Sequence, residues 1–409
     1  MAILIIGAGQ AALTTAEKYR ALGGADDVTI ISDENMLPYQ RPPLSKAYLA
    51  GEMSQDRLYL RPQDWYENNT VSVRNGRVSS IDRDAKTVNL ENGDSLAWDQ
   101  LVLTTGARAR PLPDHLAGGA GGLYTLRGIS DIEAMRDEFR PGRKLLVIGG
   151  GYIGLEAAAI ARKLGLEVTV VEAAPRILGR VASPATADHI RSMHQDHGVI
   201  IKEGVGIEEI ITTDAAAGAC VSGARLSDGS EETADFIIVG IGIIPNTELA
   251  ETAGLACDQG ILVDEYCRTS DPAVYAAGDC TRFQYRGELT RLESVGNAID
   301  QGEVVAANLL AHDGGEAMAY APKPWFWSDQ FDMTLQIAGF NRGYDDTVSR
   351  PGAKEGSVSI WYYAGDEMIA VDAMGDPRSY MIGKRLIEAG KSLPKDVVAD
   401  ADANLKEWL

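Results

Sequence analysis

One stretch of the chain, residues 144–172, constrains its fold more than any other, and it reads KLLVIGGGYIGLEAAAIARKLGLEVTVVE. It begins with a short apolar run, Leu145 to Ile148, which is typical of a buried parallel strand. An alanine-rich helical run follows, and then a second apolar run that ends in Glu172. Between the first strand and the helix lie three glycines in G-x-G-x-x-G spacing: Gly149, Gly151 and Gly154. This order predicts a βαβ unit whose first turn can hold a dinucleotide.

Each part of this pattern has a physical reason. The first glycine allows a tight turn, the second lets the backbone approach a pyrophosphate, and the third allows helix and strand to pack closely. The helix N-terminus offers N–H groups to the anion, and a carboxylate such as Glu172 binds a ribose 2′-hydroxyl. The alternative is a glycine-rich turn in an ordinary α/β unit, but here strand, helix, second strand and acid are all present. Because Glu172 repels a 2′-phosphate and the nearest cation is Arg176, we expect NADH to be preferred over NADPH.

The N-terminal residues 2–12, AILIIGAGQAA, repeat this pattern. Gly7 and Gly9 are followed by Ala12 at the third position, which is an accepted variant of the motif. When the two motifs are aligned, the place of Glu172 falls near Ser32, so we assign the ribose contact to the adjacent Asp33, the alternative being a solvated loop carboxylate. Two separate fingerprints imply two nucleotides, and the economical pair is a flavin and a nicotinamide.

Composition excludes several other classes of protein. The chain has 38 Lys and Arg against 59 Asp and Glu, a net charge of −21, which argues against a nucleic-acid binder and against an anionic membrane surface as partner. Its four cysteines form no C-x-x-C pair and no metal-site spacing, which favours a reduced, cytoplasmic setting without a bound metal. No apolar run reaches the roughly 18 residues of a membrane span.

Two further stretches carry candidate cofactor contacts. Residues 38–46, PYQRPPLSK, form a proline-stiffened loop with Arg41 and Lys46, in which Ser45 is placed to cap a helix. A proline-rich surface turn is the alternative. A later apolar strand ends at Gly278 and Asp279, where the carboxylate either accepts from a cofactor hydroxyl or caps a helix.

The last part of the chain changes character. An aromatic run, WFWSDQ at residues 325–330, is followed by predicted strands, a hairpin and a helix, which indicates a separate α+β domain. His189, His194 and His197 share an earlier predicted helix, and we interpret them as surface or packing residues because no other metal ligands accompany them.

Taken in order, these motifs resemble those of a known family, the FAD-dependent, NADH-using ferredoxin reductases of bacterial oxygenase systems, with apoptosis-inducing factor as a more distant relative. The resemblance covers nearly the whole chain. Its motifs are GAGQAA at Gly7, RPPLSK at Arg41, TTGA at Thr104, GGGYIGLE at Gly149, VGIGIIPN at Val239, AAGDC at Ala276 and WFWSDQ at Trp325.

The resemblance implies an α/β fold like that of glutathione reductase, with two nested dinucleotide-binding domains and a C-terminal α+β domain. The expected FAD domain is discontinuous, comprising residues 1–110 and 240–318. The expected NAD domain spans residues 111–239, and the C-terminal domain spans residues 319–409. Disulfide reductases of the same fold carry redox cysteines in the loop where this chain has Pro42 and Pro43, so the resemblance does not extend to their activities.

The resemblance also implies the site residues. The positions that match FAD contacts are Gly7, Gly9, Gln10, Ala11, Asp33, Arg41, Lys46, Val78, Thr105, Gly106, Arg127, Asp279 and Val295. The positions that match NAD contacts are Gly149, Gly151, Tyr152, Ile153, Gly154, Glu156, Glu172 and Gly242. Trp327 matches an aromatic residue beside the flavin and nicotinamide, and Lys46, Glu156 and Trp327 are the catalytic candidates, with the first two expected to form an ion pair.

The implied function is a flavoprotein reductase that passes electrons from NADH through FAD to a two-iron two-sulfur ferredoxin, which feeds a haem mono-oxygenase or a ring-hydroxylating dioxygenase. The alternatives are another acceptor, namely rubredoxin, a quinone or oxygen, or an NADH-sensing protein like apoptosis-inducing factor. A monomer or weak dimer is expected. Because such ferredoxins are acidic, docking requires a local basic patch, for which Arg61, Arg291, Lys323 and Arg342 are candidates.

Overall fold

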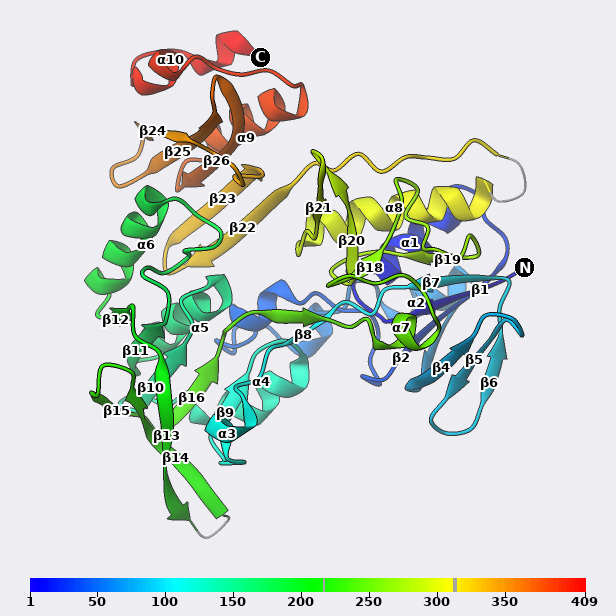
Figure 1. The fold of residues 1–409 in the computed structure, drawn as a ribbon, viewed down its shortest axis with the longest axis horizontal. Helices are drawn as coiled ribbons and strands as arrows, with labels where there is room; N and C mark the ends of the chain where they lie inside the picture. The colour runs from blue at the N-terminus through cyan, green and yellow to red at the C-terminus, as the bar shows by residue number, and fades with distance from the viewer. Residues whose placement is uncertain (216–217, 312–314) are drawn as a thin grey trace. The chain divides into compact units, whose positions relative to one another are not determined.

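The computed structural model describes residues 1–215, 218–311 and 315–409. The chain divides into two compact units (Figure 1). The first unit comprises Met1–Arg41, Ser54–Arg108 and Ile244–Pro324, and the second comprises Pro42–Met53, Ala109–Ile243 and Trp325–Leu409. The strands β8 (Ala107–Ala109) and β17 (Ile243–Pro245) span points at which the chain passes from one unit to the other.

The main sheet of the first unit is parallel, and its strands lie in the order β19-β7-β1-β2-β3. These strands are β1 (Ala2–Ile6), β2 (Asp27–Ser32), β3 (Val71–Asn75), β7 (Gln100–Leu103) and β19 (Val274–Ala276). Continuous apolar runs form the central strands because a parallel sheet is covered on both faces. The helices α1 (Gln10–Ala21) and α8 (Val295–Ala311) pack together, and a Cβ on Gly302 would lie only 3.0 Å from the Ala11 carbonyl oxygen.

Smaller elements complete the first unit. Two three-stranded sheets have the orders β4-β5-β6 and β18-β20-β21. Their strands are β4 (Val78–Asp82), β5 (Thr87–Leu90), β6 (Ser95–Ala97), β18 (Ile261–Leu262), β20 (Thr281–Tyr285) and β21 (Glu288–Thr290). The remaining helices are η2 (Gln55–Arg57), α2 (Gln63–Asn68) and α7 (Glu248–Thr252).

The second unit contains another parallel sheet, in the order β12-β11-β10-β16-β9. Its strands are β9 (Leu123–Thr125), β10 (Lys144–Ile148), β11 (Glu167–Glu172), β12 (Ile200–Glu203) and β16 (Phe236–Val239). An antiparallel sheet consists of β13 (Ile207–Ala215), β14 (Gly218–Leu226) and β15 (Glu231–Thr233). The helices of this part are η1 (Pro42–Ser45), α3 (Asp114–Ala117), α4 (Ile129–Met135), η3 (Arg136–Glu138), α5 (Tyr152–Lys163) and α6 (Pro184–Asp196).

The C-terminal part of the second unit is a five-stranded antiparallel sheet in the order β22-β23-β26-β25-β24. It comprises β22 (Trp325–Gln330), β23 (Met333–Gly339), β24 (Asp346–Pro351), β25 (Val358–Ala364) and β26 (Glu367–Met374), followed by α9 (Pro377–Glu388), α10 (Lys395–Ala399) and η4 (Leu405–Trp408). Trp361, Val371 and Leu386 lie in its core, where burial of each such side chain contributes about 1.5–3 kcal/mol.

These sheets confirm the predicted fold class. Each glycine motif lies between a parallel strand and a helix, the first unit is interrupted by the second, and the C-terminal part is α+β. One local expectation is wrong. Ser45 does not cap a following helix but ends the short helix η1, and its hydroxyl group is used in the site described below.

Candidate active site

The glycine turn between β10 and α5 fits the predicted dinucleotide geometry. Gly149 has a φ of +107°, and a Cβ there would lie 2.4 Å from the Gly240 carbonyl oxygen. A Cβ on Gly154 would lie 2.3 Å from the Gly149 carbonyl oxygen, so both positions require glycine for the protein's own packing. Gly151 differs, because its φ is −82° and its Cβ would come no closer than 4.0 Å to atoms of the other residues that the structure describes. The absent side chain therefore leaves room in front of the turn.

The groups around this turn suit an anionic ligand. Among the described residues no side chain hydrogen-bonds to the N-terminus of α5 as a cap, and Ile153 in its first turn is 42% exposed. Glu172, at the end of β11, accepts hydrogen bonds from the backbone N–H groups of Gly150 (2.8 Å) and Ala174 (2.7 Å). The carboxylate is thereby fixed beside the glycine turn, where it could accept a hydrogen bond from a ribose hydroxyl group. Gly242, with a φ of +106°, lies beside the Arg180 guanidinium.

The turn between β1 and α1 repeats this geometry in the first unit. Gly7 has a φ of +105°, and its Cβ would lie 2.2 Å from the Thr104 carbonyl oxygen. Gly9 has a φ of −91°, and a Cβ there would meet no atom of the described residues within 4 Å. Gln10 and Ala11 begin α1, whose N-terminus likewise receives no side-chain cap from the described residues. Both units thus carry an open second glycine at the start of a helix.

The strand registers show where the acid of each motif lies. Ile6 pairs with Ile31 and Ile148 pairs with Val171, so Ser32 occupies the place of Glu172. Asp33 follows Ser32 and is exposed.

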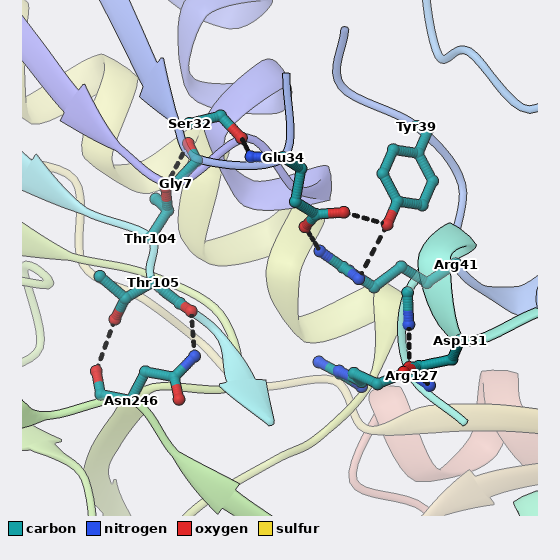
Figure 2. Close-up of polar contacts among 11 residues, drawn as sticks. Gly7, Ser32, Glu34, Tyr39, Arg41, Thr104, Thr105, Arg127, Asp131 and Asn246 are labelled. Atoms are coloured by element: carbon teal, nitrogen blue, oxygen red, sulfur yellow. Dashed lines mark hydrogen bonds and ion pairs between the residues drawn. The ribbon is translucent and has the colours of Figure 1, made fainter. Parts of the chain in front are cut away.

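The next residue, Glu34, was not predicted as a site residue. Figure 2 shows its carboxylate accepting from both the Arg41 guanidinium and the Tyr39 hydroxyl group. Glu34 therefore orients Arg41. In the sequence, only its position next to Asp33 indicates that Glu34 belongs to the site.

A pair of hydrogen bonds holds the predicted positions Thr105 and Gly106 of the first unit. The Thr105 hydroxyl donates to the Asn246 carbonyl (2.6 Å), and the Asn246 amide donates to the Thr105 carbonyl (2.8 Å) (Figure 2). These bonds fix the turn at Gly106, whose φ is +62°. Val78 is buried at the start of β4, and Val295 begins α8.

The turn that presents Asp279 depends on Gln301. The fully buried Gln301 accepts hydrogen bonds through Oε1 from the Gly278 N–H (2.8 Å) and the Thr281 hydroxyl (2.9 Å). Its Nε2 is buried and has no partner in the described part of the chain. Gln301 is thus a supporting residue of this turn that was not among the predicted sites.

In the second unit, Asp131 organises the backbone at Arg127. Its carboxylate accepts from the N–H groups of Arg127 (2.7 Å) and Gly128 (2.8 Å), which also caps α4 (Figure 2). Trp327 is half-buried on β22 and stacks on Trp325, with ring centroids 5.5 Å apart.

Lys46 and Glu156 form an ion pair, with 2.6 Å between Nζ and Oε2. The Lys46 side chain is 18% exposed and that of Glu156 only 2%. Two hydroxyl groups also donate to the carboxylate, from Ser45 and from Ser328, the latter at 2.7 Å. The opposite charge of Lys46 and the three donors together explain how a carboxylate is kept in so buried a place.

Comparison with known proteins places this geometry in a family. Residues 1–302 match the pyridine nucleotide-disulphide oxidoreductases, and residues 325–409 match the reductase C-terminal family. Rhodocoxin reductase from Rhodococcus erythropolis is 39% identical over 99% of this chain and 94% of its own length. The chain belongs to the ferredoxin reductases of oxygenase systems.

Solved structures of other ferredoxin reductases superpose closely on this one. The putidaredoxin reductase in a covalent complex with putidaredoxin has a TM-score of 0.94 at 36% identity, covering 99% of this chain and 97% of that one. The ferredoxin reductase of the CYP199A2 system from Rhodopseudomonas palustris also gives 0.94, at 38% identity, covering 100% and 99%. A rubredoxin–NAD⁺ reductase from Pseudomonas putida is 38% identical over 92% of this chain and 97% of its own length.

As a member of the ferredoxin reductases, the protein is an oxidoreductase whose cofactors are FAD and NAD(H). Its residues fit both groups, because Gly9 and Gly151 each leave open space at a helix N-terminus where a pyrophosphate would lie. All four cysteines are free, no cluster of metal-ligating side chains occurs among the described residues, and none of their helices has the length and apolar character of a membrane span.

Proposed function

We propose that this protein passes electrons from NADH through FAD to a two-iron two-sulfur ferredoxin, which feeds a haem mono-oxygenase or a ring-hydroxylating dioxygenase. The observation that carries the proposal is the pair of dinucleotide turns with open second glycines, one in each unit. The names of the relatives support the ferredoxin as acceptor, since they include a reductase bound to putidaredoxin.

The two turns divide the cofactors between them. The turn at Gly7 and Gly9 would hold FAD, within a domain of residues 1–110 and 240–318, together with Asp33, Arg41 and Asp279. The turn at Gly149 and Gly151 would hold NADH, within residues 111–239. Residues 319–409 would form the separate C-terminal domain. The other contacts proposed for FAD are Gln10, Ala11, Lys46, Val78, Thr105, Gly106, Arg127 and Val295, and those for NADH are Tyr152, Ile153, Gly154, Glu156, Glu172 and Gly242.

FAD, when bound, supplies the redox chemistry by accepting a hydride from NADH and releasing electrons one at a time. The chain's own residues position the reactants. The ion pair of Lys46 and Glu156 would place a cation at the reacting end of the nicotinamide, and Trp327 would supply an aromatic surface there. No proton transfer by a side chain is required, so these residues act by orientation and charge.

Glu172 supports a preference for NADH. The carboxylate is held beside the glycine turn by two backbone N–H groups, where it can accept from a 2′-hydroxyl and repels a 2′-phosphate. The opposing feature is Arg180, whose guanidinium lies next to Gly242.

Docking of an acidic ferredoxin onto a chain of net charge −21 needs a local basic patch. Of the candidate residues, Arg61 is paired with Glu17 and Arg291 with Glu293, so their charges are partly compensated. Lys323 and Arg342 complete the proposed set. A reduction rate of the ferredoxin that does not change with ionic strength would count against electrostatic docking.

A second candidate acceptor is rubredoxin, because a rubredoxin reductase is about as similar to this chain as the ferredoxin reductases are. The two are separated by measuring NADH-dependent reduction of each purified acceptor under one set of conditions. Faster reduction of a two-iron ferredoxin supports the proposal, and faster reduction of rubredoxin replaces it. A protein that NADH reduces but that gives electrons slowly to both would instead resemble the signalling flavoproteins.

The setting is also part of the proposal. The four free cysteines fit a reducing, cytoplasmic compartment. A monomer or weak dimer is proposed, and sedimentation of the FAD-loaded protein would test it.

A further inference from the structure

A chain of buried polar side chains leads away from Glu156 to a helix that carries none of the proposed cofactor contacts. Ser328 and Gln330 lie two residues apart on β22, so both point to the same face of the strand. The Ser328 hydroxyl lies 2.7 Å from Glu156 Oε1, and Gln330 Nε2 lies 3.0 Å from the Ser328 hydroxyl. Gln330 Oε1 in turn lies 2.8 Å from Nε2 of His194, on α6. All four residues are at most 1% exposed.

The chemistry of these groups fixes the direction of every hydrogen bond. The carboxylate of Glu156 can only accept, so Ser328 must donate its proton to it. The Ser328 oxygen then accepts from the amide of Gln330, which leaves the Gln330 carbonyl oxygen to accept from His194. The imidazole therefore carries its proton on Nε2. All three donors point toward the carboxylate, as expected of a chain that polarises in one direction.

The last side chain of this hydrogen-bonded series, His194, lies in an energetically unfavourable environment. This argues that the series has a role beyond packing. Nδ1 of His194 is buried and has no partner in the described ranges, and a buried acceptor without a donor destabilises the fold. Burial lowers the pKa of His194 to about 4, so the imidazole is neutral at ordinary pH. An apolar side chain of similar size would avoid this cost.

We infer that Ser328, Gln330 and His194 are positioning residues that hold the Glu156 carboxylate in one orientation and so set the place of the Lys46 ammonium group. The two carboxylate oxygens have different partners: Oε2 contacts Lys46 and Ser45, and Oε1 contacts Ser328. Without Ser328 as an anchored donor, the carboxylate can rotate about its last side-chain bond. The role in hydride transfer rests on the function proposed above for Lys46 and Glu156.

The first test needs no activity. The sequence has five histidines, so ¹⁵N-labelling of histidine and deletion of one signal in His194→Gln assigns His194. We expect the Nε2–H tautomer and no titration between about pH 5 and 8. A proton on Nδ1, or an imidazole that titrates near its usual pKa, would overturn the inference whether or not the protein is a reductase.

The second test measures hydride transfer from NADH in the FAD-loaded protein by stopped flow. Gln330→Leu and His194→Leu should each slow it about fivefold, the worth of one net hydrogen bond, whereas the dissociation constant of NADH should change less than about twofold. His194→Gln keeps an amide donor and should recover most of the rate. His197→Gln, at the end of the same helix, is the matched control and should leave the rate unchanged.

The decisive comparison repeats Gln330→Leu in a Glu156→Gln background. If the hydrogen-bonded side chains act through the carboxylate, Gln330→Leu should cause no further loss of rate in this background. The neutral amide that replaces the carboxylate no longer needs to be oriented against Lys46. An unchanged fivefold loss in that background would show that Gln330 acts through packing alone and would overturn the inference. Failure of NADH to reduce the wild-type flavin would instead refute the proposed function, and the tautomer would still decide the hydrogen-bond chain.

Discussion

Replacement of Lys46 by methionine should destabilise the protein more than replacement of its partner. Lys46→Met removes the cation but leaves the Glu156 carboxylate, which is 2% exposed, without its counter-ion. Glu156→Gln removes the charge from the more buried partner and leaves Lys46, which is 18% exposed and can recruit water. The two single variants therefore differ in how deeply the surviving charge is buried.

The structure sets the magnitude. At 2.6 Å and an effective dielectric constant of about 20, the attraction between the charges is about 6 kcal/mol before desolvation is subtracted. Breaking a buried pair from one side costs about 3–5 kcal/mol. We expect Lys46→Met to lower the free energy of unfolding by about 3 kcal/mol, because the surviving charge of Glu156 is buried. Glu156→Gln should lower it by only about 1–2 kcal/mol, because Lys46 is accessible to water and the amide keeps some of the hydrogen bonds.

The assay is urea unfolding of the FAD-free protein, from which the free energy of unfolding is obtained. The double variant, Lys46→Met with Glu156→Gln, should recover most of the loss because no charge remains buried. Lys384→Met is the matched control. Its pair with Glu388 is more exposed than the pair of Lys46 and Glu156, at 26% and 29%, so its loss should cost less than about 1 kcal/mol.

Equal losses in the two single variants, or a double variant whose loss is their sum, would refute this reasoning. The kinetic outcome separates stability from function. The double variant should unfold almost like the wild type and still transfer hydride from NADH slowly, because it lacks the cation that we propose lies beside the nicotinamide.

Three further predictions concern single positions. Gly151→Ala should leave unfolding unchanged to within about 0.5 kcal/mol, because its Cβ meets no atom of the described residues closer than 4.0 Å. It should nevertheless weaken NADH binding about tenfold or more in a fluorescence titration, and a normal dissociation constant would show that the pyrophosphate does not bind at this turn. Glu172→Ala combined with Ala173→Arg should raise the ratio of NADPH to NADH efficiency on the order of tenfold, and an unchanged ratio would show that Glu172 does not read the ribose. Burial raises the pKa of Asp372 from 3.8 to about 6, so its contribution to stability is fully present below about pH 4 and is lost as the pH rises through about 6. In urea titrations the wild type should therefore lose roughly 2–2.5 kcal/mol more than Asp372→Asn between about pH 4 and 7, and parallel pH profiles would contradict this.

The parts of the fold that could be predicted from the sequence are those with a local signature. The turn at Gly149 requires glycine because of its φ of +107°, and the apolar strand and helix beside it are adjacent in the chain. The same holds for the turn at Gly7. Such spacing is visible in a single sequence because strand, turn and helix follow within about 20 residues.

The supporting residues of the site could not be found in this way. The sequence around Ser45 predicts a helix cap, yet its hydroxyl group donates to Glu156, 111 residues away. The contact from Ser328 spans 172 residues and that between His194 and Gln330 spans 136. No spacing rule connects residues at such separations, because the packing of whole elements brings them together. Glu34, by contrast, lies close to Arg41 in sequence, but the competing acid Asp33 fits the motif equally well.

The central claim, that NADH reduces the bound FAD and a two-iron ferredoxin reoxidises it, is tested most directly by one stopped-flow experiment. The FAD-loaded protein is mixed first with NADH and then with purified ferredoxin, and the flavin and iron–sulfur absorbances are followed. The account predicts rapid bleaching of the flavin and then fast reduction of the ferredoxin, one electron at a time. A flavin that NADH bleaches but that stays reduced in the presence of ferredoxin would contradict it.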